Sequence, residues 1–383
     1  MYRRSHRLLQ TFYLTSFAAL GLYVPYFNLH LRALGFPDRE IGFLLAMLPL
    51  AKATLPAVWG MAADRSGQRR LLLAASTWLA AGSFAGFLAA ESFTACLVVM
   101  AFYATFSVPA LPFVEATTLE VLEASGGRYG RIRVAGSLGF ASTALLYGWL
   151  AGSASSSRVV PAMLIMLAIN ACIASLIIPP PPARRAPAPP PLTFLRHPPI
   201  ILLLAAGFLM QASHGAYLGF FSLVLQEAGY SSLAVGAAWG GAIGAEVIMM
   251  LWVDRLAARL GVSRLLALSV AAAALRWGMY AVTLSPLVLV LGQGLHAFTY
   301  AGFHVAAVKA IFRLFPRSTR ATGQALYSGL TYGAGLTAGT MISGLVKEKM
   351  GQAAMFWVAC ALALASLGLI LGGAGRKPGQ TES

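Results

Sequence analysis

The sequence predicts an all-α membrane protein with twelve transmembrane helices arranged in two six-helix halves. Of its 383 residues, 58% are hydrophobic and only 10% are charged, whereas a soluble domain is usually about 25% charged. Twelve apolar segments follow one another along the chain, each close to the ~20 residues that a spanning helix needs. A proline-rich stretch after the sixth segment divides them six and six.

The first apolar segment follows a basic N-terminus and is too long for the core of a cleaved signal peptide, so we expect it to be a retained helix. The division between the ninth and tenth segments is the least distinct, because only Ser285 and Pro286 separate them. The predicted spans are 8–31, 41–62, 70–90, 93–119, 131–152, 158–178, 199–225, 232–253, 262–284, 286–312, 320–346 and 352–373.

The proline-rich stretch is predicted to be a linker between two helical bundles. Residues 179–199 hold ten of the twenty prolines in the chain, and such a segment favours an extended conformation and cannot form a core. We therefore expect an N-terminal bundle at 1–178, a linker at 179–198 and a C-terminal bundle at 199–383.

The distribution of basic residues predicts the orientation in the membrane. Twenty of the 28 Lys and Arg residues, among them Arg133 at the start of a span, fall on the side that would carry both termini and the linker. Three others, Lys52, Arg276 and Lys309, lie inside spans. The opposite side holds five: Arg32, Arg39, Arg158, Lys347 and Lys349. By the positive-inside rule, both termini are expected in the cytoplasm, in a cell (inner or plasma) membrane. The net charge of +16 therefore does not indicate a nucleic-acid partner.

A short motif recurs at the end of the second helix of each half. Asp-Arg is followed by a glycine and a basic residue in both copies. The residues concerned are Gly60, Asp64, Arg65 and Gly67 in the first half and Asp254 and Arg255 in the second. Two repeated six-helix halves are typical of transporters whose site lies between the halves.

The segment Gly60–Arg70 resembles the signature of the loop between helices 2 and 3 in the major facilitator superfamily. In that superfamily the loop links helix ends and helps to set the conformational equilibrium. The resemblance therefore implies a major facilitator fold, and it implies a conformational-switch role for the six motif residues.

Two further resemblances narrow the group. Val114-Glu115-Ala116 followed by Tyr129-Gly-Arg-Ile-Arg133 resembles the sugar symporters of the lactose permease type, which implies that Glu115 and Arg133 bind substrate. The C-terminal half resembles the 3-phenylpropionate transporter family. That second resemblance is clearest in Gln211–Tyr217, Ala228–Tyr230, Ala245–Ile248, Arg276–Gly278, Leu295–His296 with His304, and Gln324–Ser328.

This sequence departs from the sugar symporters at their proton site. The position where they carry a proton-carrying glutamate is Thr299, and the position of its lysine partner is Gln293. A threonine cannot titrate in the accessible pH range, so any coupling proton must lie elsewhere. Drug-exporting antiporters of the superfamily have a Gly-Pro motif in helix 5, but residues 131–152 contain no proline.

Charged residues inside spans are costly, so they normally pair or line a wet path. Lys52 could hold a substrate carboxylate or form an interhelical ion pair. Glu246 and Arg276 could be a structural pair or the coupling element, and Glu115 with Arg133 could bind ligand or only join two helices. We expect Lys309 to extend towards the membrane surface. The charged residues in spans are Lys52, Glu115, Arg133, Glu246, Arg276 and Lys309.

Histidine and aromatic side chains share faces of the predicted helices 1, 7 and 10. They would suit a flat apolar ligand, and ordinary packing between helices is the alternative. With the charged residues, they give the candidate substrate-binding set Glu115, Arg133, Lys52, His214, Tyr217, Tyr26 and Thr299. The candidate proton-coupling set is Glu246, Arg276 and His296, with Glu246 the expected carrier and His296 its rival.

The sequence therefore predicts a secondary transporter that works by alternating access, and not an enzyme. We expect proton symport of a small organic molecule such as an aromatic carboxylate. A sugar or nucleoside is the alternative substrate, and a membrane receptor that does not transport is a further alternative. The expected partners are the substrate, protons and the lipid bilayer, and we expect a monomer.

The three cysteines lie far apart in apolar runs, so we expect no metal site, and we expect no cofactor.

Overall fold

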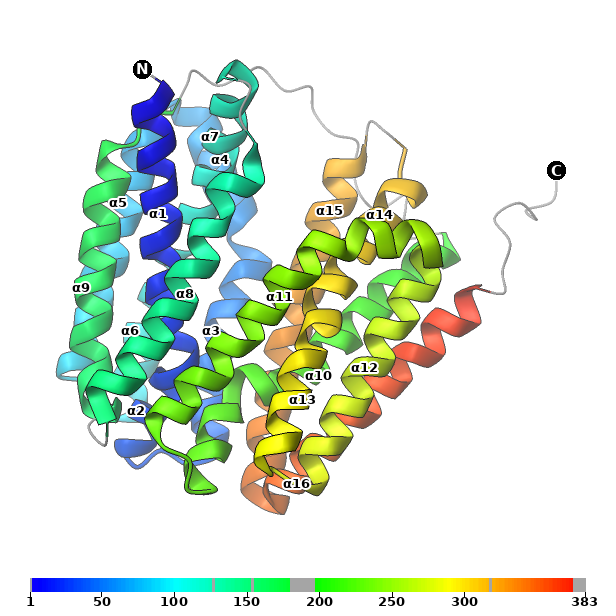
Figure 1. The fold of residues 1–383 in the computed structure, drawn as a ribbon. Helices are drawn as coiled ribbons and strands as arrows, with labels where there is room; N and C mark the ends of the chain where they lie inside the picture. The colour runs from blue at the N-terminus through cyan, green and yellow to red at the C-terminus, as the bar shows by residue number, and fades with distance from the viewer. Residues whose placement is uncertain (1, 126–127, 153–154, 180–196, 317–318, 375–383) are drawn as a thin grey trace. The chain divides into compact units, whose positions relative to one another are not determined.

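The computed structural model describes residues 2–125, 128–152, 155–179, 197–316 and 319–374, and every regular element in these ranges is a helix (Figure 1). A lipid-exposed chain must satisfy its backbone hydrogen bonds within each segment, which a helix does. The predicted all-α membrane fold is confirmed. The helices of the first half are α1 (Tyr2–Leu22), η1 (Tyr23–Phe27), α2 (Asn28–Ala33), α3 (Asp38–Thr54), α4 (Pro56–Ser66), α5 (Arg69–Phe84), η2 (Ala85–Leu88), α6 (Phe93–Ser107), α7 (Ala110–Ser125), α8 (Tyr129–Ala151) and α9 (Ser155–Leu176).

The second half continues with long helices that are interrupted near their centres. Its helices are α10 (Pro198–Glu227), α11 (Ser232–Leu260), α12 (Val262–Val282), α13 (Pro286–Ala297), η5 (Phe298–Gly302), α14 (Phe303–Leu314), α15 (Arg320–Ser328), η7 (Gly329–Gly335) and α16 (Leu336–Ala374).

The number of membrane spans is close to the prediction. Among the described residues, nine helices are long and apolar enough to cross a membrane, or ten if the bent pair α3–α4 is one span. One of the nine, Arg320–Gly372, covers two predicted spans. The predicted span 286–312 is helical, as α13, η5 and α14, but is not among the nine. The count of twelve stays a prediction.

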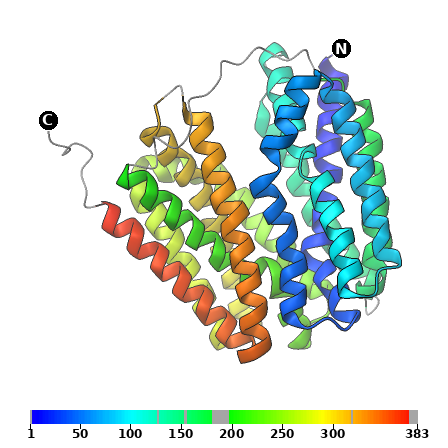
Figure 2. The ribbon, with the colours of Figure 1, turned by 180° about the vertical axis from the view of Figure 1, so that it is seen from behind.

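Two breaks in these helices have identifiable causes. α3 and α4 meet at an angle of 46°, where Pro56 occupies the first turn of α4 and cannot donate a backbone hydrogen bond to α3. Within α16, Gly351 has a φ of 83°, which favours glycine because it has no Cβ. Figure 2 shows the chain turning back on itself there, between the orange and red parts of α16.

The chain forms two compact units. Unit 1 comprises Met1–Arg185 and Gly219–Ile243, and unit 2 comprises Ala186–Leu218 and Gly244–Ser383, so α10 and α11 each contribute to both. The predicted linker at 179–198 falls mainly on residues 180–196, which lie outside the described part of the chain. The predicted domain boundary therefore stays a prediction.

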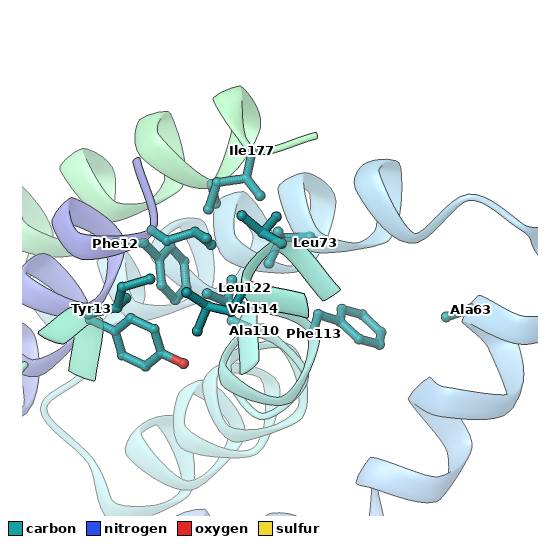
Figure 3. Packing of buried hydrophobic residues seen from close by; sticks show 13 residues of the cluster. Phe12, Tyr13, Ala63, Leu73, Ala110, Phe113, Val114, Leu122 and Ile177 are labelled. Carbon is teal, nitrogen blue, oxygen red and sulfur yellow. The ribbon is translucent and has the colours of Figure 1, made fainter. Parts of the chain in front are cut away.

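The core of unit 1 joins α1 to α5, α7 and α9. Figure 3 shows Phe12 and Tyr13 of α1 beside Val114 and Leu122 of α7, with Leu73 of α5 next to them. Fully burying a large apolar side chain contributes about 1.5–3 kcal/mol, so this cluster fixes α1 against α7. Gly139 of α8 completes the packing on another side, because a Cβ there would collide with the backbone carbonyl of Leu14.

The two copies of the repeated motif have the same local structure. α4 ends at Ser66 and is followed by Gly67 with a φ of 65°, and α11 ends at Leu260 and is followed by Gly261 with a φ of 82°. A glycine with positive φ is the common way to end a helix. The repeat thus lies at a pair of helix ends, although α4 ends one residue after Arg65 and α11 continues five residues beyond Arg255.

Within the described ranges, three stretches of π-helix interrupt the spans, in η1, η5 and η7. In a π-helix each backbone hydrogen bond spans five residues instead of four, and such stretches frequently occur at functional sites. η1 contains Tyr26 and η5 contains Thr299, which are two of the candidate substrate-binding residues.

Candidate functional site

Unit 1 contains a pocket of about 120 Å³ between its helices. Lys52 of α3 lines it, three residues before the bend at Leu55 and Pro56. The Lys52 side chain is exposed, and its amine makes no hydrogen bond or ion pair with any residue that the structure describes. An ammonium inside a membrane span normally has a partner. Lys52 therefore offers a cation for an anionic group that enters the pocket.

The wall of this pocket is apolar and aromatic. Phe17, Leu20 and Tyr103 contribute rings or alkyl groups. Three hydroxyl groups in the wall have protein partners: Thr77 donates to Leu73 O at 2.9 Å, Ser107 donates to Ala104 O at 3.3 Å, and Ser16 accepts from Asn170 Nδ2 at 2.8 Å. The pocket thus combines one unpaired cation with few free hydrogen-bonding groups.

The predicted pair Glu115 and Arg133 lies beside this pocket. The Arg133 guanidinium is 4.0 Å from the centre of the Phe17 ring, and Phe17 lines the pocket. Glu115 accepts a hydrogen bond from the Tyr129 hydroxyl at 3.5 Å. Lys52 and Phe17 thus line the same pocket, and Arg133 stacks on Phe17. Arg133 also interacts electrostatically with Glu115, but its close contacts are with the rings of Phe17 and Tyr13.

Unit 2 contains a buried cluster around Arg276 of α12. The Arg276 side chain is fully buried and donates hydrogen bonds to Gln293 Oε1 at 2.9 Å and to His296 Nδ1 at 3.0 Å. Its guanidinium lies 4.0 Å from the centre of the Tyr217 ring, and the Tyr217 hydroxyl also donates to Gln293 Oε1, at 3.0 Å. Stacking and hydrogen bonds together offset the cost of burying this charge.

The hydrogen bond from Arg276 determines which tautomer His296 adopts. A guanidinium can only donate, so Nδ1 of His296 must accept and the imidazole proton is on Nε2. Nε2 lies 3.9 Å from Glu246 Oε2 of α11. The predicted pairing of Glu246 with Arg276 is therefore indirect, because His296 stands between them.

The other candidate substrate-binding residues have protein partners. His214 is fully buried beside Trp277, and its Nδ1 is 2.9 Å from Met210 O of the preceding turn. The Tyr26 hydroxyl donates to Ala144 O at 2.7 Å, and Thr299 donates to His296 O at 3.3 Å. Tyr217 belongs to the Arg276 cluster. Their proposed contact with substrate stays a prediction.

The helix-end motifs differ in their contacts. Asp64 and Arg65 are exposed, and the contact between helices in that region is instead a two-pronged ion pair from Arg69 to Glu120 of α7, at 2.8–2.9 Å. In unit 2, Asp254 pairs with Lys309 at 2.8 Å. Arg255 lies over the ring of Trp252.

Removing the Glu120 carboxylate should destabilise unit 1. Glu120→Gln leaves the half-buried Arg69 without its partner, at a cost of about 1–3 kcal/mol, and the midpoint of thermal unfolding in detergent should fall by several degrees. Glu123→Gln is the matched control, because Glu123 is exposed and has no ion pair in the described structure. Equal midpoints for the two variants would show that the Arg69 pair contributes nothing.

Three contacting residues were missed in the candidate lists. Gln293 was noted only as a departure from the sugar symporters, yet it holds both Arg276 and Tyr217. Arg69 and Glu120 were each visible as charges near helix ends, but nothing in their sequence spacing indicates that they meet.

Among the described residues, no group of three or more His, Cys, Asp or Glu side chains could hold a metal ion.

Comparison with known proteins agrees with this architecture. The model of the MFS_1 like family matches residues 6–358. The chain is 29% identical over 377 residues to the maltose permease of Geobacillus stearothermophilus, covering 97% of this chain and 95% of the relative. It is 27% identical over 382 residues to the "Probable 3-phenylpropionic acid transporter" of Escherichia coli K12, covering 96% and 97%. The crystal structure of a nucleoside transporter superposes with a TM-score of 0.83 at 17% identity, covering 97% and 98%.

The described chain is all helical, and its helices are long and apolar enough to cross a membrane several times. The relatives and the solved structure that match nearly its whole length are transporters. The protein is therefore a multi-pass membrane transporter and not an enzyme. The chain belongs to the MFS_1 like family of the major facilitator superfamily. The suspected relationship to 3-phenylpropionate transporters and to sugar permeases of the superfamily is confirmed.

Proposed function

We propose that this transporter carries a small aromatic carboxylate together with a proton, by alternating access. The observation that carries the proposal is Lys52, an ammonium without a partner in the described structure, on the wall of an apolar, aromatic pocket. A carboxylate would supply the missing charge, and the ring of the substrate would contact Phe17 and Tyr103. Arg133, stacked on Phe17, adds positive potential at the same wall.

The size of the pocket favours a substrate with a single ring. An apolar protein cavity of about 150 Å³ holds one benzene molecule, and the unit 1 pocket measures about 120 Å³. A disaccharide is much larger and needs many hydrogen-bonding partners, whereas the hydroxyls of Thr77 and Ser107 bond to their own helices. The name of the 27% identical relative supports the same substrate class.

A sugar or nucleoside is the second candidate substrate. The similarity to a maltose permease supports it, as does the Glu115 and Arg133 motif. In the structure, Arg133 lies over the rings of Phe17 and Tyr13, and a sugar would have to displace these contacts. We therefore place this candidate second.

The contacts in unit 2 support Glu246 as the proton carrier. Nδ1 of His296 accepts a hydrogen bond from the positively charged Arg276 side chain. A proton added to Nδ1 would point at this donor, so His296 stays neutral as long as the bond is intact. The carboxylate of Glu246 is then the group in this cluster that can take a proton. Movement of Arg276 would change the surroundings of Glu246 through His296, which couples proton affinity to conformation.

We also propose the remaining properties expected from the sequence. Both termini face the cytoplasm, the protein resides in the inner or plasma membrane, and it acts as a monomer. Glycine and charged residues of the two repeated motifs, Gly60, Asp64, Arg65, Gly67, Asp254 and Arg255, take part in the conformational switch. The ion pair between Asp254 and Lys309 supports this role in unit 2.

A binding comparison tests the proposed substrate. Purified protein would be titrated with 3-phenylpropionate, its uncharged amide, maltose and uridine, and the midpoint of thermal unfolding measured, since a ligand of the native state raises it. We expect the acid to raise the midpoint and the amide to have little effect. A rise with maltose or uridine and none with the acid would replace the proposal by the second candidate.

A further inference from the structure

One side of α15 and η7 carries a row of polar atoms that have no hydrogen-bond partner in the described part of the chain. The atoms are Arg320 Nε, Gln324 Oε1, Tyr327 OH and Thr331 Oγ1, and all four are buried. The spacing of four, three and four residues keeps these side chains on one side of the helix. We call these four residues the α15 row.

The α15 row leads from the end of a helix into the interior of unit 2. Arg320 and Gln324 are half-buried, whereas Tyr327 and Thr331 are fully buried. Gly207 of α10 lies against the inner end, and a Cβ at this position would fall 2.6 Å from Thr331 Oγ1 and 3.3 Å from the Tyr327 ring. The Thr331 hydroxyl and the Tyr327 ring thus lie against a position of α10 that carries no side chain.

Buried polar atoms without partners are rare in proteins, and each calls for an explanation. An unmet hydroxyl or amide in an apolar environment costs about 1–3 kcal/mol in proteins, so four on one helix side would be a substantial penalty. Ordered water is the usual partner of such groups, because one water makes two to four hydrogen bonds. A set of water molecules along the α15 row would satisfy all four atoms.

The inner end of the row adjoins the aromatic residues that lead to Glu246. Tyr332 follows Thr331 in η7, and its hydroxyl is 2.9 Å from His304 Nδ1. The Tyr332 ring is 5.8 Å from the ring of Tyr327 and 6.3 Å from that of Tyr300. Tyr300 in turn stacks on His296 at 5.5 Å. Neighbouring aromatic rings that bear hydroxyl or imidazole groups therefore lead from the α15 row to the His296–Glu246 pair.

We propose that the α15 row holds a file of water molecules that carries protons between the His296–Glu246 pair and the Arg320 end of α15. The carboxylic acid of Glu246 gives its proton to the nearest hydroxyl or water, each member accepts one proton and passes on another, and the last water releases one to solvent. Hydroxyls, waters and imidazoles can do this, and intramembrane relays are built from such groups. The presence of the water molecules does not depend on the proposed function, whereas their role in proton transfer rests on the proposed proton coupling.

Radiolytic hydroxyl-radical labelling in H₂¹⁸O tests for the water directly, without a substrate. Radicals formed from bound water label side chains that touch it. We expect Tyr327 and Tyr332 to incorporate ¹⁸O much faster than Trp239, a buried ring whose Nε1 donates to Ser222 Oγ at 2.9 Å. If both tyrosines are as unreactive as Trp239, the row is dry and the proposal is wrong.

Two substitutions test the proton route. Tyr327→Phe and Thr331→Val remove one hydroxyl each and keep the shape of the side chain. In proteoliposomes with 3-phenylpropionate as the probe, we expect proton-driven uptake to slow by about tenfold or more, while exchange of substrate across the membrane at equal pH is unchanged. Tyr23→Phe is the matched control, because the Tyr23 hydroxyl is also buried without a partner but lies in unit 1.

The two experiments separate this proposal from the proposed function. Equal losses of uptake and exchange would mean that the hydroxyls only support the fold, and the route would be rejected. If the wild-type protein moves substrate with no response to pH, proton coupling itself fails and the route with it. The labelling result then still decides whether the row holds water.

Discussion

Lys52→Gln should abolish the preference for 3-phenylpropionate over its uncharged amide that we propose for this transporter. Lys52 makes no ion pair or hydrogen bond within the described structure, so its charge is available to a ligand. The Lys52 ammonium is exposed at the pocket, and a carboxylate bound there would form a pair that the bound substrate desolvates. Removing one partner of such a pair costs about 2–5 kcal/mol, which is at least about 30-fold in affinity. Calorimetric titration of both ligands measures the change.

Matched variants separate charge from shape at this position. Lys52→Arg keeps the cation and should retain most of the preference for the acid. Lys349→Gln removes a charge from an exposed position and should leave both affinities unchanged. If Lys52→Gln weakened the acid and the amide equally, Lys52 would shape the pocket without binding the carboxylate.

Glu246→Gln should uncouple transport from the proton gradient that we propose drives it. A glutamine resembles the protonated acid but cannot release a proton, so the step that binds substrate can proceed while the proton cycle cannot. One pH unit is worth 1.36 kcal/mol per proton, which corresponds to about tenfold accumulation if one proton moves with each substrate. We expect this accumulation to fall to none, while exchange of labelled substrate continues.

His296→Gln is the informative comparison for this second prediction. Glutamine can still lie between Arg276 and Glu246 but cannot titrate, and with Glu246 as carrier, accumulation should persist at a reduced rate. If Glu246→Gln accumulates substrate against its gradient and His296→Gln does not, the proton belongs to His296. The hydrogen bond from Arg276 to His296 Nδ1 at 3.0 Å would then have to break before each protonation.

The helical framework could be predicted because it depends on local pattern. Each predicted span coincides with helix in the described structure, since about 20 apolar residues in sequence dictate a helix in lipid. The helix ends were predicted less well: the predicted spans stopped at 62 and 253, whereas α4 and α11 continue to Ser66 and Leu260, because a criterion based on apolar residues leaves out their charged last turns. The π-helical stretches could not be predicted, because residues such as Thr299 and Thr331 do not differ in local preference from their neighbours.

The site was predicted less completely because it depends on contacts between distant helices. Charge inside a span was enough to single out Lys52, Glu246 and Arg276 as candidates. It could not show that Lys52 has no partner among the described residues, or that His296 separates Arg276 from Glu246. Those facts depend on the rotation of α3, α11 and α12 about their axes, which the apolar sequences of these helices leave almost undetermined.

Accumulation of 3-phenylpropionate driven by a pH gradient is the most direct test of the account. Wild-type protein in proteoliposomes with an alkaline lumen would be given the labelled acid, with protein-free liposomes correcting for passive entry of the neutral form. We predict that the protein raises internal substrate above that control, and that collapsing the gradient with a protonophore releases the excess. Uptake equal to that of the protein-free liposomes, or unchanged by the protonophore, would contradict proton-coupled transport of this acid.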